Sequence, residues 1–139
     1  MQKYISHSAD ETKKLAQRLA QNTQARIFAL TGDLGAGKTI FVQGFAQGLD
    51  IKEKIISPTF VLIRQHHIPN TDKTLYHIDL YRLEKEEDFK QLGLKDLLND
   101  SNHLILIEWA EKIKGLLPKM TTWIYLETAN QNSRQITIV

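Results

Sequence analysis

The most distinctive chemistry in this chain belongs to the run Gly32-Asp33-Leu34-Gly35-Ala36-Gly37-Lys38-Thr39. This run is a complete match to the phosphate-binding pattern G-x-x-x-x-G-K-[ST]. Glycines, which lack a Cβ, let the main chain wrap closely around an anion, and successive N–H groups then point inward at it. Lys38 is expected to reach the β- and γ-phosphates, and the Thr39 hydroxyl to meet Mg²⁺. The pattern therefore predicts that residues 33–39 bind a nucleoside triphosphate.

The residues on either side of this loop supply the local structure that it needs. The apolar run 26–31 indicates a strand, and the amphipathic stretch 40–49 indicates a helix. A helix that begins directly after the loop adds its positive dipole end to the phosphate site. An accidental match in an ordinary glycine turn is the competing interpretation. The flanking strand and helix make such an accident rarer.

Hydrolysis also needs a carboxylate for the metal and a group that places water. Asp79 and Glu108 each end a strand-like segment, 74–79 and 103–108, and such groups gather at the C-terminal ends of strands in open α/β sheets. Glu108 follows the cleaner apolar run, which favours it as the metal-linked carboxylate and leaves Asp79 to position water or to switch. Spacing alone leaves that order open, and either acid can instead be a helix cap or a salt-bridge partner.

Three further residues are candidates for the site, and each also has a structural interpretation. Thr59 follows Pro58 on the connection after the loop helix, where GTPase-like folds carry a switch hydroxyl; it can equally begin a strand. Trp109 directly follows Glu108 and either covers the site or fills core space. His77 titrates near neutral pH, yet a single histidine in a strand is more often structural.

The remaining pattern predicts one α/β domain over residues 1–139. Ser8 and Glu11 form a capping box before a first helix. Short helices are expected over 84–92 and 94–98, separated by Gly93, and another over 109–117. Segments 60–63 and 74–79 read as strands, while 121–127 and 134–139 form a hairpin pattern. The predicted fold is a three-layer fold like that of P-loop nucleotide hydrolases, with a mainly parallel sheet and an antiparallel C-terminal hairpin.

Composition excludes several classes of function. The 139 residues contain no cysteine, so disulfides, thiolate metal sites and cysteine nucleophiles are excluded. The formal net charge of +2 is too small to argue for nucleic acid. The sequence contains no apolar segment of membrane-spanning length and no signal-peptide pattern, so a cytoplasmic location without membrane contact is expected.

Four motifs in order resemble those of the small bacterial ATPase family TsaE, formerly YjeE. They are GDLGAGKT at 32–39, SPTF at 57–60, HIDLYRL at 77–83 and IEWAE at 107–111. The first is common to many nucleotide hydrolases, whereas the other three in this order and in so short a chain are far more specific. The resemblance covers nearly the whole chain.

The resemblance implies an ATPase that uses ATP and Mg²⁺ and supports threonylcarbamoyladenosine synthesis on tRNA. Its partners would be the proteins TsaB and TsaD, with tRNA involved only indirectly through them. By matching motifs, Thr39 and Glu108 would hold Mg²⁺, residues 33–39 the phosphates, and Thr59, Asp79 and Trp109 would form the catalytic and switching set. The resemblance also implies nucleotide contacts near the start of the first helix, at Ser8, and in the C-terminal hairpin, at Arg134.

Other interpretations of the phosphate loop remain open. A small P-loop kinase usually needs an arginine-rich lid and an acceptor pocket, and no compact arginine cluster is present. A GTPase is disfavoured because the Asn/Thr-Lys-x-Asp guanine-reading segment is missing. A nucleotide-gated binding module with little hydrolysis is the hardest to separate. Ile40 departs from the family, which usually has a second small hydroxyl residue there; it is expected to face the helix with little effect on phosphate binding.

Overall fold

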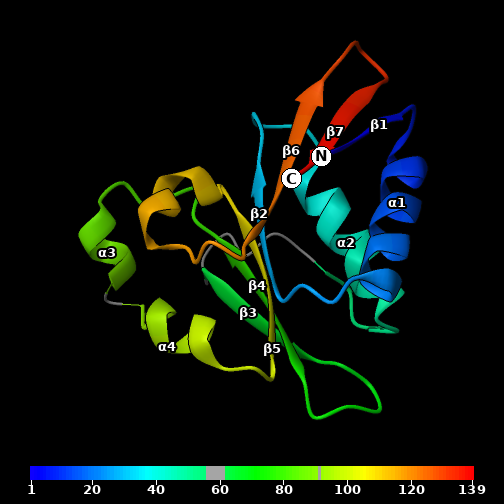
Figure 1. Cartoon of the computed structure of the whole chain (residues 1–139). Coiled ribbons are helices and arrows are strands. Elements are labelled where there is room, and N and C mark those ends of the chain that lie inside the picture. Colours follow the sequence, from blue (N-terminus) through cyan, green and yellow to red (C-terminus); the bar gives the residue numbers. More distant parts are fainter. Residues whose placement is uncertain (56–61, 91) are drawn as a thin grey trace.

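The computed structural model describes residues 1–55, 62–90 and 92–139, and their strands form one mixed sheet (Figure 1). The order across the sheet is β1-β7-β6-β2-β5-β4-β3. The strands are β1 (Gln2–Ser6), β2 (Ile27–Thr31), β3 (Ile63–His67), β4 (Thr74–Asp79), β5 (His103–Glu108), β6 (Thr122–Thr128) and β7 (Arg134–Ile138).

The central strands of the sheet are parallel, and the strands at both of its edges run antiparallel to their neighbours. Strand β2 pairs in parallel with β5 and β6, and β5 pairs in parallel with β4. Strand β7 runs antiparallel to both β6 and β1, and β3 runs antiparallel to β4. The predicted mixed sheet with an antiparallel C-terminal hairpin is confirmed. Because β2, β4 and β5 are parallel, their C-terminal ends meet at one edge, where the phosphate loop also lies.

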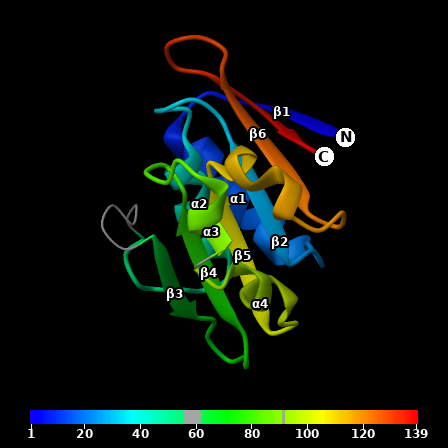
Figure 2. The same cartoon turned by 90° about the vertical axis from the view of Figure 1, so that its left-hand side faces the viewer.

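Helices cover both faces of the sheet, which gives the predicted three layers (Figures 1 and 2). Helices α1 (Ala9–Asn22) and α2 (Lys38–Gly48) pack on one face, and their side chains form one apolar cluster with it. The other face carries α3 (Glu86–Lys90), α4 (Leu94–Asn99) and the 3₁₀ helix η1 (Ala110–Leu116), which contribute to a second apolar cluster. Gly93, with φ 70°, separates α3 from α4 as predicted.

The first helix begins where the capping residues predict. The Ser8 hydroxyl accepts a hydrogen bond from the Glu11 main-chain N–H at 3.1 Å. The Glu11 carboxylate accepts from the N–H of His7 at 2.6 Å, one residue before the cap. The reciprocal bond of the capping box is therefore present but displaced by one residue from its usual donor. It fixes the direction in which the chain leaves β1.

Helices α1 and α2 pack closely because α2 has small residues on the shared side. A Cβ added to Gly44 would lie 2.4 Å from the Lys13 carbonyl oxygen, and one on Gly48 would lie 2.6 Å from that of Gln17. Neither distance is compatible with a side chain, so these glycines set the spacing between the helices.

Two edge strands differ from the sequence-based expectations. Strand β1 was not predicted, because its polar and apolar residues carry little signal without knowledge of its partner β7. The strand expected over 60–63 is found at Ile63–His67, which is a polar segment on the other edge; residues 56–61 lie outside the described part of the chain. Among the described residues, no helix combines the length and apolar character needed to cross a membrane.

Candidate functional site

The phosphate loop connects the end of β2 with the first turn of α2. Gly35 and Gly37 adopt left-handed backbone angles, φ 83° and 102°, which suit glycine. Gly37 is the N-cap of α2, and no side chain caps this end of the helix. The N–H groups of the first turn are therefore left for another acceptor. An anion bound in the loop would supply it.

The first glycine of the loop is required for a steric reason. A Cβ on Gly32 would lie 2.3 Å from the Leu126 carbonyl oxygen of β6. The loop thus passes directly over the main chain of the neighbouring strand. Its position is fixed by the sheet as well as by its own turn.

Lys38 is buried and folds back onto the loop. Its ammonium group donates hydrogen bonds to the carbonyl oxygens of Gly32 and, at 3.1 Å, Asp33. It also lies 4.0 Å from the centre of the Trp109 ring. Burial lowers the pKa of Lys38 below its ordinary value, and nearby carboxylates, Glu108 first among them, oppose that shift. These contacts hold a positive charge where phosphate oxygens would lie.

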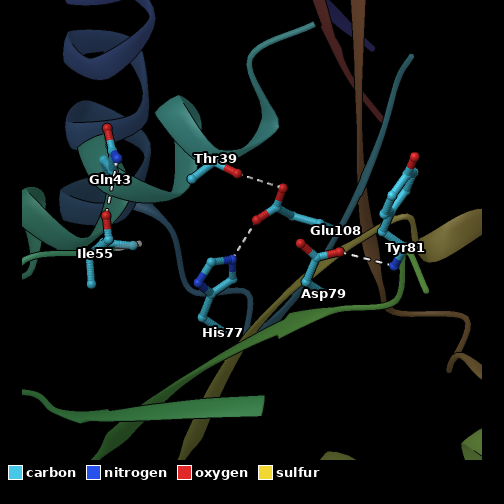
Figure 3. A network of polar contacts seen from close by, with 7 residues as sticks. All are labelled: Thr39, Gln43, Ile55, His77, Asp79, Tyr81 and Glu108. Carbon is cyan, nitrogen blue, oxygen red and sulfur yellow. Dashed lines mark hydrogen bonds and ion pairs between the residues drawn. The ribbon is translucent and has the colours of Figure 1, made fainter. Parts of the chain in front are cut away.

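Glu108 is the centre of a buried network that joins β5 to α2 and β4 (Figure 3). The Thr39 hydroxyl donates to Glu108 Oε1 at 2.9 Å, and His77 Nε2 lies 2.5 Å from Oε2. Since a carboxylate accepts, Nε2 carries the hydrogen. His77 is fully buried, and its Nδ1 has no hydrogen-bond partner within the described part of the chain. The two contacts fix both oxygens of Glu108.

Asp79 ends β4 beside Glu108 and is also buried. Its Oδ1 accepts from the main-chain N–H of Tyr81 at 3.0 Å (Figure 3). The N–H of Leu80 donates to the Glu108 carbonyl oxygen at 3.2 Å. The turn after β4 is therefore tied both to Asp79 and to the end of β5.

Trp109 adopts a left-handed conformation, φ 62° and ψ 37°, at the start of η1. For a bulky residue this costs on the order of 1–3 kcal/mol, a strain that is concentrated at functional sites. Its ring lies 5.2 Å from that of Tyr81, between centres. The indole lies beside Lys38 and also packs against the second apolar cluster, so its position fits both alternatives that the sequence left open.

Two cavities flank the loop. One, of about 410 Å³, is lined by Lys38, Thr39, Asp79 and Glu108, together with Tyr81 and Arg82. The other, of about 440 Å³, is lined by residues of the first helix and the C-terminal hairpin. Both share Gly35, Gly37 and Ile40. Ile40, which was expected to face the helix, is half-buried in the first turn of α2 and forms part of both cavity walls.

Ser8 and Arg134 both line the second cavity. The Arg134 guanidinium donates to the Gly35 carbonyl oxygen at 3.3 Å and to that of Ser133 at 3.1 Å. His7 Nδ1 lies 3.2 Å from the Ser133 hydroxyl. The hairpin and the first helix are thus connected beside the phosphate loop, although they are far apart in the sequence.

Comparison with known proteins identifies the family. The profile of the family described as threonylcarbamoyl adenosine biosynthesis protein TsaE matches residues 6–136. The chain belongs to the TsaE family. Relatives named tRNA threonylcarbamoyladenosine biosynthesis protein TsaE include one from Rickettsia felis, 42% identical over 97% of this chain and 78% of the relative, and one from Treponema pallidum, 38% identical over 96% and 97%.

A solved structure gives the same fold. The crystal structure of Bacillus subtilis YdiB superposes with a TM-score of 0.80, at 32% identity, over 99% of this chain and 83% of that one. The residues that the TsaE profile matches include the loop, the two strand-end carboxylates and β6. The α/β fold with its parallel centre is therefore the TsaE fold.

The donor set of this TsaE chain suits magnesium bound together with phosphates. Within the described ranges no group of three or more acidic, histidine or cysteine side chains could hold a metal alone. Thr39 and Glu108 nevertheless place a hydroxyl and a carboxylate within 2.9 Å of each other at the phosphate loop. Mg²⁺ characteristically takes one or two protein oxygens, and substrate phosphates and water complete its shell. The residues present fit that mode.

Two further candidates from the sequence, Thr59 and His77, differ in what the structure says of them. Thr59 lies outside the described residues; the chain before it is anchored by Gln43, whose amide donates to the Ile55 carbonyl oxygen at 3.1 Å (Figure 3). His77, which the sequence left as a candidate that is more often structural, holds Glu108 through its Nε2. Its position two residues before Asp79, on the parallel neighbour of β5, was the available signal.

Proposed function

We propose that this TsaE-family chain is a magnesium-dependent ATPase that acts in threonylcarbamoyladenosine modification of tRNA. The proposal rests on one hydrogen bond, 2.9 Å long, that the Thr39 hydroxyl at the end of the phosphate loop donates to Glu108 Oε1. A loop alone would bind nucleotide. A buried carboxylate beside the hydroxyl of the loop adds the means of holding a metal at the phosphates. All seven described strands share one sheet, which supports residues 1–139 acting as one ATPase domain.

The two cavities suggest how ATP lies. The triphosphate would occupy the cavity containing Lys38 and Thr39, held by the N–H groups of residues 33–39. The nucleoside would pass over Gly35 and Gly37 into the cavity that Ser8 and Arg134 line. The two cavities share Gly35, Gly37 and Ile40. The two glycines support this route, since a bound molecule can pass closely over main chain that has no side chain.

Each residue has a proposed role in hydrolysis. Lys38 would balance the phosphate charge, and Thr39 and Glu108 would hold Mg²⁺, which when bound neutralises charge on the phosphate oxygens. Asp79, held by the Tyr81 N–H, would orient the attacking water. Trp109 would exclude bulk water beside Lys38. Thr59 would supply a hydroxyl that responds to the γ-phosphate.

The names of the relatives support a role for this activity in tRNA modification. Relatives at 37–43% identity carry the name tRNA threonylcarbamoyladenosine biosynthesis protein TsaE. We infer a cytoplasmic role with the proteins TsaB and TsaD as partners, in which hydrolysis resets their complex. The tRNA would then be served indirectly, without being bound by this chain.

Hydrolysis of Mg²⁺-ATP by the purified chain, alone and with its cognate TsaB–TsaD pair, tests the proposal. Strong stimulation by the pair is expected, and Asp79→Asn should lose it while still binding ATP. Tight ATP binding without hydrolysis, with or without the pair, would instead favour a nucleotide-gated docking module. Phosphate transfer to an added small-molecule acceptor would favour a kinase.

A further inference from the structure

Lys112 has an unusual set of contacts for a lysine at the start of a short helix. Its Nζ donates to the carbonyl oxygens of Leu80, Tyr81 and Leu83, at 3.0, 2.6 and 2.9 Å. An ammonium group has three N–H donors. All three are used by one turn, residues 80–83, which belongs to the connection after β4. The proposed mechanism gives Lys112 no role.

The main chain of Lys112 is fixed to the other side of the site. Its N–H donates to the Trp109 carbonyl oxygen at 3.2 Å, which closes the first turn of η1. Trp109 directly follows Glu108 at the end of β5. Lys112 therefore joins the connection after β5, through its main chain, to the connection after β4, through its side chain.

The turn that Lys112 holds is the one that positions Asp79. The Tyr81 N–H donates to Asp79 Oδ1 at 3.0 Å, and its carbonyl oxygen accepts the shortest of the Lys112 bonds. Tyr81 and Arg82 also line the cavity beside the phosphate loop. A shift of this turn would move the donor that orients the carboxylate and two walls of the cavity.

The contacts to aromatic rings are a weaker alternative explanation. Lys112 Nζ lies 5.8 Å from the ring centres of both Tyr81 and Trp109. Cation–π attraction is effective only within about 6 Å of the centre. These rings are therefore at the limit of the range, whereas the three carbonyl oxygens are at full hydrogen-bonding distance. The hydrogen bonds decide what Lys112 does.

The geometry points to Lys112 as a positioning residue that holds the 80–83 turn, and through it Asp79, in the arrangement that hydrolysis requires. It is not among the residues that line the cavity, so it acts on the nucleotide only through the turn. The catalytic part of this inference rests on the proposed ATPase function. The structural part, that Lys112 orders the turn, does not.

Three variants separate this role from a general effect of charge. Lys112→Met keeps the length of the side chain and removes its donors. Lys114→Met is the matched control, because Lys114 lies on the same 3₁₀ helix and its Nζ lies 5.8 Å from the centre of the Trp123 ring, on β6. Lys112→Arg retains N–H donors, so it should recover part of the order of the 80–83 turn that is lost in Lys112→Met.

The first measurement is hydrogen exchange at the amides of Tyr81 and Leu83 in the nucleotide-free chain. Lys112→Met should exchange at least about tenfold faster than wild type at both amides, since three hydrogen bonds that close the turn are lost. Lys114→Met should stay within about twofold. Equal exchange in wild type and Lys112→Met would overturn the inference, whether or not the chain hydrolyses ATP.

The second measurement is partner-stimulated ATP hydrolysis. A misplacement of Asp79 should lower kcat in Lys112→Met by on the order of 10²-fold, with ATP affinity within about threefold because the loop contacts remain. Faster exchange with unchanged kcat would overturn the link to catalysis. Absence of hydrolysis in wild type would count against the proposed function, and the exchange data would still decide the role of Lys112.

Discussion

Asp79 and Glu108 face each other at the same register position of the neighbouring parallel strands β4 and β5. Their side chains have different partners despite this equivalence. Glu108 is held by Thr39 and by His77, whereas Asp79 accepts from the main chain of Tyr81. The acid that contacts the hydroxyl of the phosphate loop is the one suited to a metal. Asp79 is the one suited to orienting water.

Glu108→Gln is expected to separate nucleotide binding from turnover. ATP affinity without metal should change little, because the loop supplies the phosphate contacts. Mg²⁺-dependent hydrolysis should fall by more than about 10²-fold, since even outer partners of metal ligands are worth about 10–100-fold. Glu127→Gln, exposed on β6, is the control. Hydrolysis at the wild-type rate in Glu108→Gln would assign the metal to Asp79.

Lys38→Ala should abolish tight ATP binding. Hydrogen bonds to charged groups contribute about 1.5–3 kcal/mol each, so the loss of two phosphate contacts lowers affinity by at least about 10²-fold. Calorimetric titration with ATP measures it, and the exposed Lys119→Ala is the control. A folded Lys38→Ala chain with unchanged affinity would exclude this loop as the phosphate site.

Trp109 should report nucleotide binding through its fluorescence. A cation–π contact is worth about 0.5–2 kcal/mol, less than the charged hydrogen bonds that phosphates offer, so Lys38 should leave the indole when ATP binds. The emission change is expected to persist in Trp123→Phe and to disappear in Trp109→Phe. Loss of the signal in Trp123→Phe would place the response at β6 instead.

Alkaline pH should weaken metal-free ATP binding. Burial lowers the pKa of Lys38 below 10.5, and the phosphates need the protonated ammonium, which is present below that pKa and lost above it. Affinity should therefore fall as pH rises through the lowered pKa, by up to about tenfold per pH unit. Lys38→Arg stays charged and should flatten the decline. A parallel decline in both proteins would assign the effect to another group.

Gly44→Ala should destabilise the fold without involving the site. The added Cβ would lie 2.4 Å from the Lys13 carbonyl oxygen. Overpacking costs about 1–3 kcal/mol, and the better helix propensity of alanine returns at most about 1 kcal/mol. Urea unfolding should show the loss. Gly115→Ala, where a Cβ meets nothing within 4 Å, is the control and should stay near wild type.

Much of the fold could be predicted because its signals are local. The loop pattern, the cap at Ser8 and the break at Gly93 each depend on residues close in the sequence. The apolar run before Glu108 likewise identified β5 and placed its carboxylate at the correct edge. Strand β1 could not be found in this way, because only its pairing with β7 makes it a strand.

The sequence predicted that Lys38, Thr39 and Glu108 lie together, and all three line one cavity; the contacts of His77 and Lys112 were not predicted. Lys38, Thr39 and Glu108 have residue types and positions that name their chemistry. His77 and Lys112 act through partners on other elements, across β4 and β5 and between two connections. Such contacts depend on strand register and on the path of a turn. The position of His77 two residues before Asp79 was a signal of the first, whereas nothing near Lys112 in the sequence indicated the second.

The pairing of β1 with β7 sets the order in which this sheet can be completed during synthesis. Strand β1 is synthesised before β7, yet Ser6 pairs with Arg134 and Gln2 with Ile138, so the two strands lie side by side (Figure 1). Strand β6, whose main chain supports the phosphate loop at Gly32, is also made late. Domains generally begin folding from the N-terminus as they are made. A nascent chain therefore keeps an unpaired edge and an incomplete nucleotide site until the final hairpin has emerged.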